Sequence, residues 1–155
     1  MKTRFINAFR GNTLYLLNML KGLTDEDMLL CTGESNTIGW ILGHIIRYRG
    51  SILQKMNNEI DIKDFEKNFE RGAKKNKGLK INYEEAINNF SSRGDKIVSS
   101  LTDMDNEAFK QNIGMELPGG KNDLESLLAF LSWHETFHLG QIDLIKAAVG
   151  KGGIK

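Results

Sequence analysis

Three residue types are scarce in this 155-residue sequence, and each scarcity excludes some chemistry. The single cysteine, Cys31, has no partner for a disulfide within the chain, which excludes a disulfide scaffold and a cysteine-rich zinc site and fits a reducing compartment. We interpret Cys31 by default as a small buried apolar residue. Only three histidines are present, so any site that uses imidazole draws on His44, His134 and His138.

An excess of charge of one sign and a long apolar run are also lacking. Twenty-one Lys and Arg residues balance 20 Asp and Glu residues, and the net charge of +1 favours neither nucleic acid nor an anionic membrane surface as a partner. The basic run from Arg71 to Lys80 has no interleaved aromatic residue or glycine-rich loop and is interpreted as a solvated connection. No segment approaches the roughly 20 apolar residues of a membrane span, and polar residues near Arg10 interrupt the apolar stretch that a signal peptide needs. We therefore expect a cytoplasmic protein.

Proline is nearly absent too, with Pro118 as the single one, and long segments carry apolar residues at spacings of three and four. This pattern predicts an all-α fold with helices over about residues 4–22, from Asn36 or Thr37 to about residue 52, over about 83–101 and over about 122–149. The segment of about residues 57–79 is polar, and we expect one helical turn in it around Phe65 and Phe69. The prediction is a four-helix bundle with a long crossover between helices 2 and 3, forming one domain over residues 1–155.

The fourth predicted helix places two histidines where a bundle normally has leucine. His134 and His138 are one turn apart on a stripe with Leu127, Leu131 and Ile142, so both imidazoles can reach one divalent ion. The remaining histidine, His44, is on the apolar second helix, and a third neutral imidazole completes the ligand set of an open zinc site. The alternative is three buried neutral histidines with local hydrogen-bond partners. We favour the metal site, because buried polar groups without partners are costly.

Two enzyme classes with similar motifs are not favoured. His134 to His138 match H-E-x-x-H literally, but Gly140 is two residues past His138 rather than three, and Asp143 is the last acidic residue, so the usual third ligand of a zinc peptidase is missing. Glu135 and His138 also form half of a di-iron motif. Ile41 stands where the second half needs a glutamate, which argues against a ferritin-like centre.

Three further side chains of this region have alternative roles. Glu135 could orient a ligand imidazole, act as a base towards metal-bound water, or be a solvated surface carboxylate. Gln141 could bond near the histidines or be a packing amide, and Tyr48 could donate to a metal-bound ligand or be a core tyrosine with a wet tip. A second apolar stripe either packs on the first helix or forms an interface between two copies of the chain; it comprises Phe130, Trp133, Phe137 and Leu144.

Two segments resemble the DinB-like superfamily, also described as YfiT-like metal-dependent hydrolases. They are Asn36-Thr37-Ile38-Gly39-Trp40-Ile41-Leu42-Gly43-His44-Ile45 and Trp133-His134-Glu135-Thr136-Phe137-His138-Leu139-Gly140-Gln141-Ile142. Acidic turns that follow the first and third predicted helices are similar to the family as well, so the resemblance spans nearly the whole chain.

The resemblance implies a four-helix bundle that binds zinc or nickel through His44, His134 and His138. The family includes thiol S-transferases that use low-molecular-weight thiols such as bacillithiol and a mycothiol-dependent isomerase, and dimers are common in it. The leading hypothesis is therefore a metal-dependent enzyme that activates a thiol or water for attack on a small-molecule substrate. The alternatives are a non-catalytic metal-binding stress-response bundle, closed by Glu135 or Cys31 as a fourth ligand, and a purely structural bundle.

Overall fold

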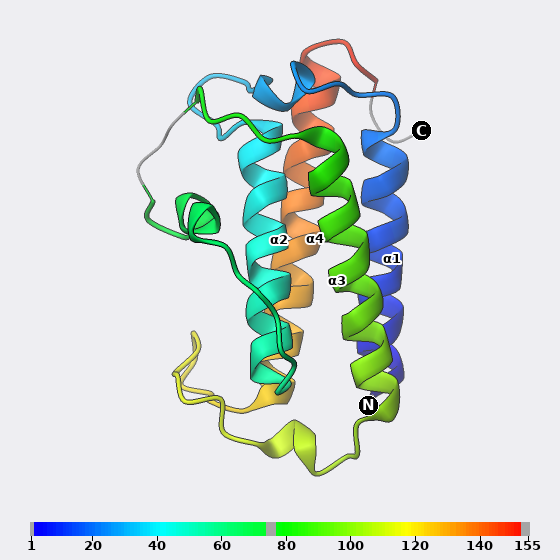
Figure 1. Ribbon diagram of the computed structural model, residues 1–155, viewed down its shortest axis with the longest axis vertical. Coiled ribbons are helices and arrows are strands. Elements are labelled where there is room, and N and C mark those ends of the chain that lie inside the picture. The colour runs from blue at the N-terminus through cyan, green and yellow to red at the C-terminus, as the bar shows by residue number, and fades with distance from the viewer. Residues whose placement is uncertain (1, 74–76, 153–155) are drawn as a thin grey trace.

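Four long helices lie side by side in the computed structural model, which describes residues 2–73 and 77–152 (Figure 1). The all-α bundle expected from the sequence is confirmed. The long helices are α1 (Lys2–Leu20), α2 (Ile38–Lys55), α3 (Tyr83–Asp103) and α4 (Leu124–Ala148), and short 3-10 helices form η1 (Asp27–Leu29), η2 (Asp64–Phe69) and η3 (Ala108–Lys110). Within this part of the chain, no helix is both long enough and apolar enough to cross a membrane.

Side-chain caps determine where three of the long helices begin. Thr37, rather than Asn36, caps α2, because its hydroxyl oxygen accepts the backbone N–H of Trp40 at 3.1 Å. Asn82 and Asp123 cap α3 and α4 in the same way. Each bond satisfies a donor that the first helical turn leaves without a partner, so the sequence specifies these boundaries locally.

The order of the helices around the bundle differs from their order in the chain. Helix α1 packs on α3 and α4, and α2 also packs on α3 and α4 (Figure 1). Helices α1 and α2 therefore lie on one diagonal of the bundle, and α3 and α4 lie on the other. This arrangement makes α2 and α4, the two helices that carry the histidines, direct neighbours.

The crossover between α2 and α3 lies against α2, and its expected helical turn around Phe65 and Phe69 is confirmed as η2. The close approach depends on Gly43, because a Cβ atom at that position would meet the Phe69 ring at 2.6 Å. Glu66 of η2 is buried and forms an ion pair with Arg93 of α3 at 2.7 Å. The crossover is thus attached to the bundle by apolar contact on one side and by a buried ion pair on the other.

The apolar core consists of two clusters on either side of a polar layer. One cluster gathers the N-terminal half of α2 with the C-terminal half of α4, and the other gathers the opposite halves. Between them lies Arg49, which is fully buried and bonds to Glu135 of α4, to Thr13 of α1 and to the Phe90 carbonyl of α3. A single side chain of α2 therefore connects all four helices at mid-height, close to the histidines.

Candidate metal centre

The three histidines of the chain lie together between α2 and α4. One ring nitrogen from each of His44, His134 and His138 can be chosen so that all three lie within 4.8 Å of one another. The ring centroids are 5.2 Å apart for His44 and His134, 4.8 Å for His44 and His138, and 4.4 Å for His134 and His138. Three imidazole nitrogens from two rigid helices are a donor set that suits zinc and nickel, so the cluster is compatible with a divalent metal.

Hydrogen bonds fix the ring orientation of two of these histidines. Nδ1 of His44 lies 2.5 Å from the main-chain carbonyl oxygen of Phe69, and Nδ1 of His138 lies 2.6 Å from Oε1 of Gln141. Both oxygens accept, so each Nδ1 carries the proton and each Nε2 carries a lone pair. Such outer hydrogen bonds are typical of metal-binding histidines, since they select the tautomer and aim the free nitrogen.

The third histidine completes the arrangement on α4. Nε2 of His134 lies 3.1 Å from Nε2 of His138. Because Nε2 of His138 holds a lone pair, the two nitrogens need a positively polarised partner between them, either the proton of His134 or a cation bound by both rings. The two rings thus lie one helical turn apart on one side of α4, as expected from their spacing, in an arrangement compatible with two ligands of one ion.

Burial keeps the cluster neutral at pH 7. It lowers the pKa of His44 from 6.5 to about 4, against the opposing effect of the hydrogen bond to Phe69. The pKa of His134 is likewise lowered to about 4, mainly by burial and in smaller part by the nearby His138, His44 and Arg71. The pKa of His138 is also lowered by burial, although Gln141 and the charge of Glu135 raise it in part. Neutral imidazole is the form that binds metal ions.

Aromatic side chains surround the histidines. The Trp40 ring stacks on His44 with centroids 4.7 Å apart, and its indole N–H donates to the Asn68 carbonyl oxygen at 3.1 Å. Tyr48 presents an edge to His44 at 4.7 Å, and Phe130 stacks on His134 at 5.8 Å. His134 itself is half-buried, whereas His44 and His138 are buried. The cluster is shielded on several sides and is accessible along His134.

Glu135 is buried on another side of α4 and faces Arg49. The guanidinium Nε and Nη2 donate to its two carboxylate oxygens at 2.9 and 2.7 Å. One of the three alternatives for Glu135, a solvated surface carboxylate, is therefore wrong. Both oxygens accept from Arg49, which favours a structural role. The other two roles, orienting a ligand imidazole and acting as a base, stay predictions.

A fourth protein ligand is not part of the cluster. Within residues 2–73 and 77–152, the group of candidate ligands contains only His44, His134 and His138. Cys31 lies outside it and is half-buried, not buried as expected. A metal ion bound by the three histidines would therefore have at least one coordination position open to another molecule.

The second apolar stripe of α4 does not pack on α1 as one alternative had it. Trp133, Phe137 and Leu144 are exposed by 61%, 51% and 66%, and only Phe130 is half-buried. At mid-height of α1, the residues of α4 that bond to α1 are Ser132, whose carbonyl oxygen accepts from Asn12, and Thr136, whose hydroxyl donates to Asn12. The remaining alternative, an interface between two copies of the chain, stays a prediction.

Sequence reasoning missed two groups that support the site. The Phe69 carbonyl belongs to the main chain, so no residue type indicates it. Arg49, in contrast, has a recognisable signal: an arginine in a helix that is apolar over most of its circumference needs a buried acidic partner. Gln141, which the helical spacing placed near the histidines, does bond to His138.

Comparisons with known proteins agree with this architecture. The family model that matches residues 8–142 is that of the DinB superfamily. A solved structure, described as YfiT from Bacillus subtilis, a probable metal-dependent hydrolase with an unusual four-helix bundle topology, superposes with a TM-score of 0.67. It is 16% identical and the match covers 96% of this chain and 87% of that one, a similarity that shows the fold. No curated protein sequence matches.

Proposed function

The chain belongs to the DinB superfamily, and from this membership and its histidine cluster we propose that it is a metal-dependent enzyme. In this proposal His44, His134 and His138 bind one divalent ion, zinc or nickel. The observation that carries it is the hydrogen bonding of the two buried rings, whose Nδ1 atoms are both held so that their Nε2 atoms are left for a ligand.

The reaction type we propose is activation of a thiol or a water molecule. A divalent ion at the cluster would lower the pKa of a thiol or water beside it and so supply a nucleophile near neutral pH. The residues of the chain would position the ion and its surroundings: the Phe69 carbonyl and Gln141 hold the ligand rings, and Trp40 shields His44 from water. The description of YfiT as a probable metal-dependent hydrolase supports hydrolysis, and the resemblance in sequence supports thiol transfer equally.

A closed, non-catalytic metal site is less well supported. It needs a fourth protein ligand, and the two candidates are Glu135 and Cys31. Arg49 occupies both carboxylate oxygens of Glu135, and Cys31 is outside the cluster. These contacts favour an open site, which is the type that enzymes use.

The substrate we propose is a small molecule that approaches along the half-buried His134, with a low-molecular-weight thiol as one reactant. We also propose that two copies of the chain associate through the exposed stripe of Trp133, Phe137 and Leu144, which lies beside that approach. The mass of the protein in solution tests the dimer, and a monomer at all concentrations contradicts it. A cytoplasmic location stays a prediction.

Cobalt-loaded protein tests the open position and the thiol together. Titration with 2-mercaptoethanol is expected to produce a thiolate-to-cobalt charge-transfer band in the wild type and in Cys31→Ser, and none in His44→Ala. A band that disappears in Cys31→Ser would assign the sulfur to the chain. Absence of the band in the wild type contradicts thiol activation, and a screen for metal-dependent ester hydrolysis then tests the hydrolase alternative.

A further inference from the structure

A cavity of about 500 Å³ lies between α2, α3 and the crossover, and it does not include the histidines. Its volume is within the range of small-molecule sites in proteins. The apolar part of its lining comes from all three elements and comprises Ile46, Ile60, Phe65, Phe69, Ile81 and Ala86. Nothing in the proposed reaction uses this space.

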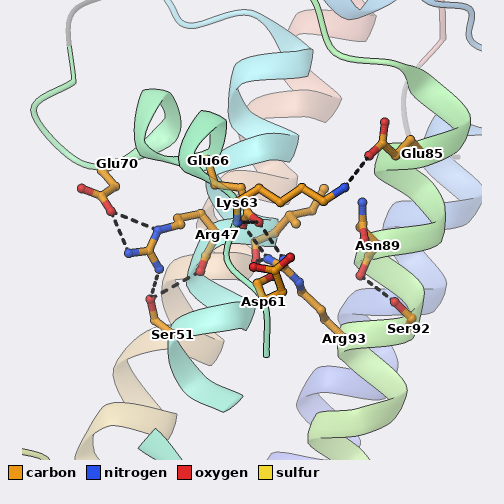
Figure 2. Close-up of polar contacts among 11 residues, drawn as sticks. Arg47, Ser51, Asp61, Lys63, Glu66, Glu70, Glu85, Asn89, Ser92 and Arg93 are labelled. Carbon is orange, nitrogen blue, oxygen red and sulfur yellow. Dashed lines mark hydrogen bonds and ion pairs between the residues drawn. The ribbon is translucent and has the colours of Figure 1, made fainter. Parts of the chain in front are cut away.

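The mouth of the cavity carries charges of both signs. Lys63 of the crossover and Glu85 of α3 form an ion pair across it, with Nζ 3.4 Å from Oε1 (Figure 2). Both side chains are more than half exposed, and exposed ion pairs of this kind contribute little to stability. Asp61 and Lys80 add one further charge of each sign to the lining. A ligand that offers its own carboxylate and ammonium groups can therefore replace the Lys63–Glu85 pair at small cost.

The deeper charges are already paired. The guanidinium of Arg93 donates to both carboxylate oxygens of Glu66 at 2.7 and 2.8 Å (Figure 2). It also donates to the Ile46 carbonyl oxygen at 2.8 Å. Because this pair is buried and satisfied, it forms a wall of the cavity and not a free binding group. The charged end of a ligand is thus directed to the mouth and its apolar body to the interior.

Phe69 belongs both to the cavity and to the histidine cluster. Its ring lines the cavity and packs over Gly43, while its carbonyl oxygen accepts the Nδ1 proton of His44. The preceding residue in η2, Asn68, accepts the indole N–H of Trp40, which stacks on His44. A molecule that moves or fixes η2 therefore changes the support of His44.

We propose that this cavity binds a small zwitterion with an apolar body, of the size of an apolar dipeptide, and that its occupation changes the metal affinity of the histidine cluster through η2. The carboxylate is bound by Lys63 and Lys80, and the ammonium group by Glu85 and Asp61. The apolar body lies between α2 and the Phe69 ring. The binding half of the proposal stands alone, whereas the coupling half rests on the proposed metal binding.

Ligand-observed NMR and calorimetry with leucylleucine test the binding half. We expect saturable binding to the wild type and at least tenfold weaker binding to Asn89→Phe, which fills the cavity from α3. Asn88→Phe is the matched control, because Asn88 is exposed on the same helix and outside the lining. N-acetyl-leucylleucine amide, which lacks both charges, is expected to bind the wild type more weakly than leucylleucine does. The variant Lys63→Gln/Glu85→Gln is expected to bind leucylleucine more weakly than the wild type does. Circular dichroism checks that the variants are folded.

Each outcome of this experiment decides the binding half. Absence of saturable binding to the wild type, or equal binding to Asn89→Phe and Asn88→Phe, overturns it. Equal affinity for leucylleucine and for its uncharged derivative overturns the zwitterion class. If Asn89→Phe is unfolded, the comparison of Lys63→Gln/Glu85→Gln with the wild type decides in its place, since those two side chains are exposed.

The dissociation constant of zinc, measured with and without saturating leucylleucine, tests the coupling half. We expect a change of at least threefold, and linkage requires the same factor in the affinity for the dipeptide when zinc is present. An unchanged zinc affinity overturns the coupling. If the wild type binds no zinc, the proposed function has failed, and the dipeptide titration on the metal-free protein still decides the binding half.

Discussion

Arg49 of α2 and Glu135 of α4 form a bidentate ion pair in the centre of the bundle. Nε and Nη2 of the arginine donate to the two carboxylate oxygens at 2.9 and 2.7 Å, and both side chains are buried. His44 is five residues before Arg49 on α2, and Glu135 lies between the two histidines of α4 in sequence. The pair therefore fixes the relative register of the two helices that carry the cluster.

Glu135→Gln is expected to destabilise the protein by about 3–5 kcal/mol, because it leaves the charge of Arg49 buried without a counter-ion. Urea denaturation measures this loss. The matched control is Glu125→Gln on the same helix, whose partner Arg4 is 60% exposed, and its cost should be under about 1 kcal/mol. A Glu135→Gln variant of wild-type stability that loses only turnover would contradict the structural role and identify Glu135 as a base.

Gly43→Ala tests the close packing of the crossover on α2. The added Cβ would meet the Phe69 ring at 2.6 Å, so the ring and the carbonyl that holds His44 must shift. We expect a loss of about 1–3 kcal/mol in stability and weaker metal binding. Gly140→Ala on α4 is the control, because its Cβ has no neighbour within 4 Å, and it should stabilise the protein by about 0.5–1 kcal/mol. Equal behaviour of the two variants would show that Phe69 is not held against α2.

Gln141→Ala should weaken metal binding by about 10–100-fold, since the amide oxygen no longer selects the tautomer of His138. The fold should be retained, because Gln141 is only half-buried. A competition titration with a chelating indicator measures the metal affinity. Gln54→Ala, at an exposed position of α2, should have the affinity of the wild type. Equal metal affinities of the two variants would show that Gln141 does not support His138 as a ligand.

Mild acid is expected to destabilise the metal-free protein. The pKa of His44 and that of His134 are lowered from 6.5 to about 4 in the folded protein, with burial as the largest cause. Below pH 6.5 the unfolded chain therefore takes up protons that the folded chain does not, and stability falls as the pH decreases towards 4.

Urea midpoints at pH 7.0, 6.0 and 5.0 measure this effect in a range where carboxylates change little. The decrease should be smaller in His44→Gln, which has one fewer buried imidazole. A midpoint that is constant from pH 7 to 5, or an equal decrease in both proteins, would contradict neutral buried histidines.

The spacing of apolar residues and of helix caps was sufficient to predict the bundle, the crossover and the placement of the three histidines in one part of the core. Those features depend on local rules: helical periodicity placed His134 and His138 on one face, and Asn36 and Thr37 were the two candidates for the start of α2, of which Thr37 is the cap. The burial of His44 followed from the apolar character of its helix. These parts of the site could be predicted because each depends on residues within a few turns.

The supports of the site could not be predicted in the same way. The Phe69 carbonyl reaches His44 from 25 residues along the chain, and a main-chain group has no signature in the residue type. Arg49 and Glu135 are 86 residues apart, and their pairing depends on α2 and α4 being neighbours. The exposure of Trp133 and Phe137 likewise follows from the packing order of the helices, which periodicity alone does not determine.

The proposed function depends on the binding of one divalent ion by the three histidines. Elemental analysis of protein purified without an affinity tag or nickel column, and dialysed against metal-free buffer, tests it most directly. We expect close to one zinc or nickel ion per chain in the wild type and in Cys31→Ser, and almost none in folded His44→Ala. No bound metal in the wild type after loading with zinc or nickel, or the same metal content in His44→Ala, would contradict it.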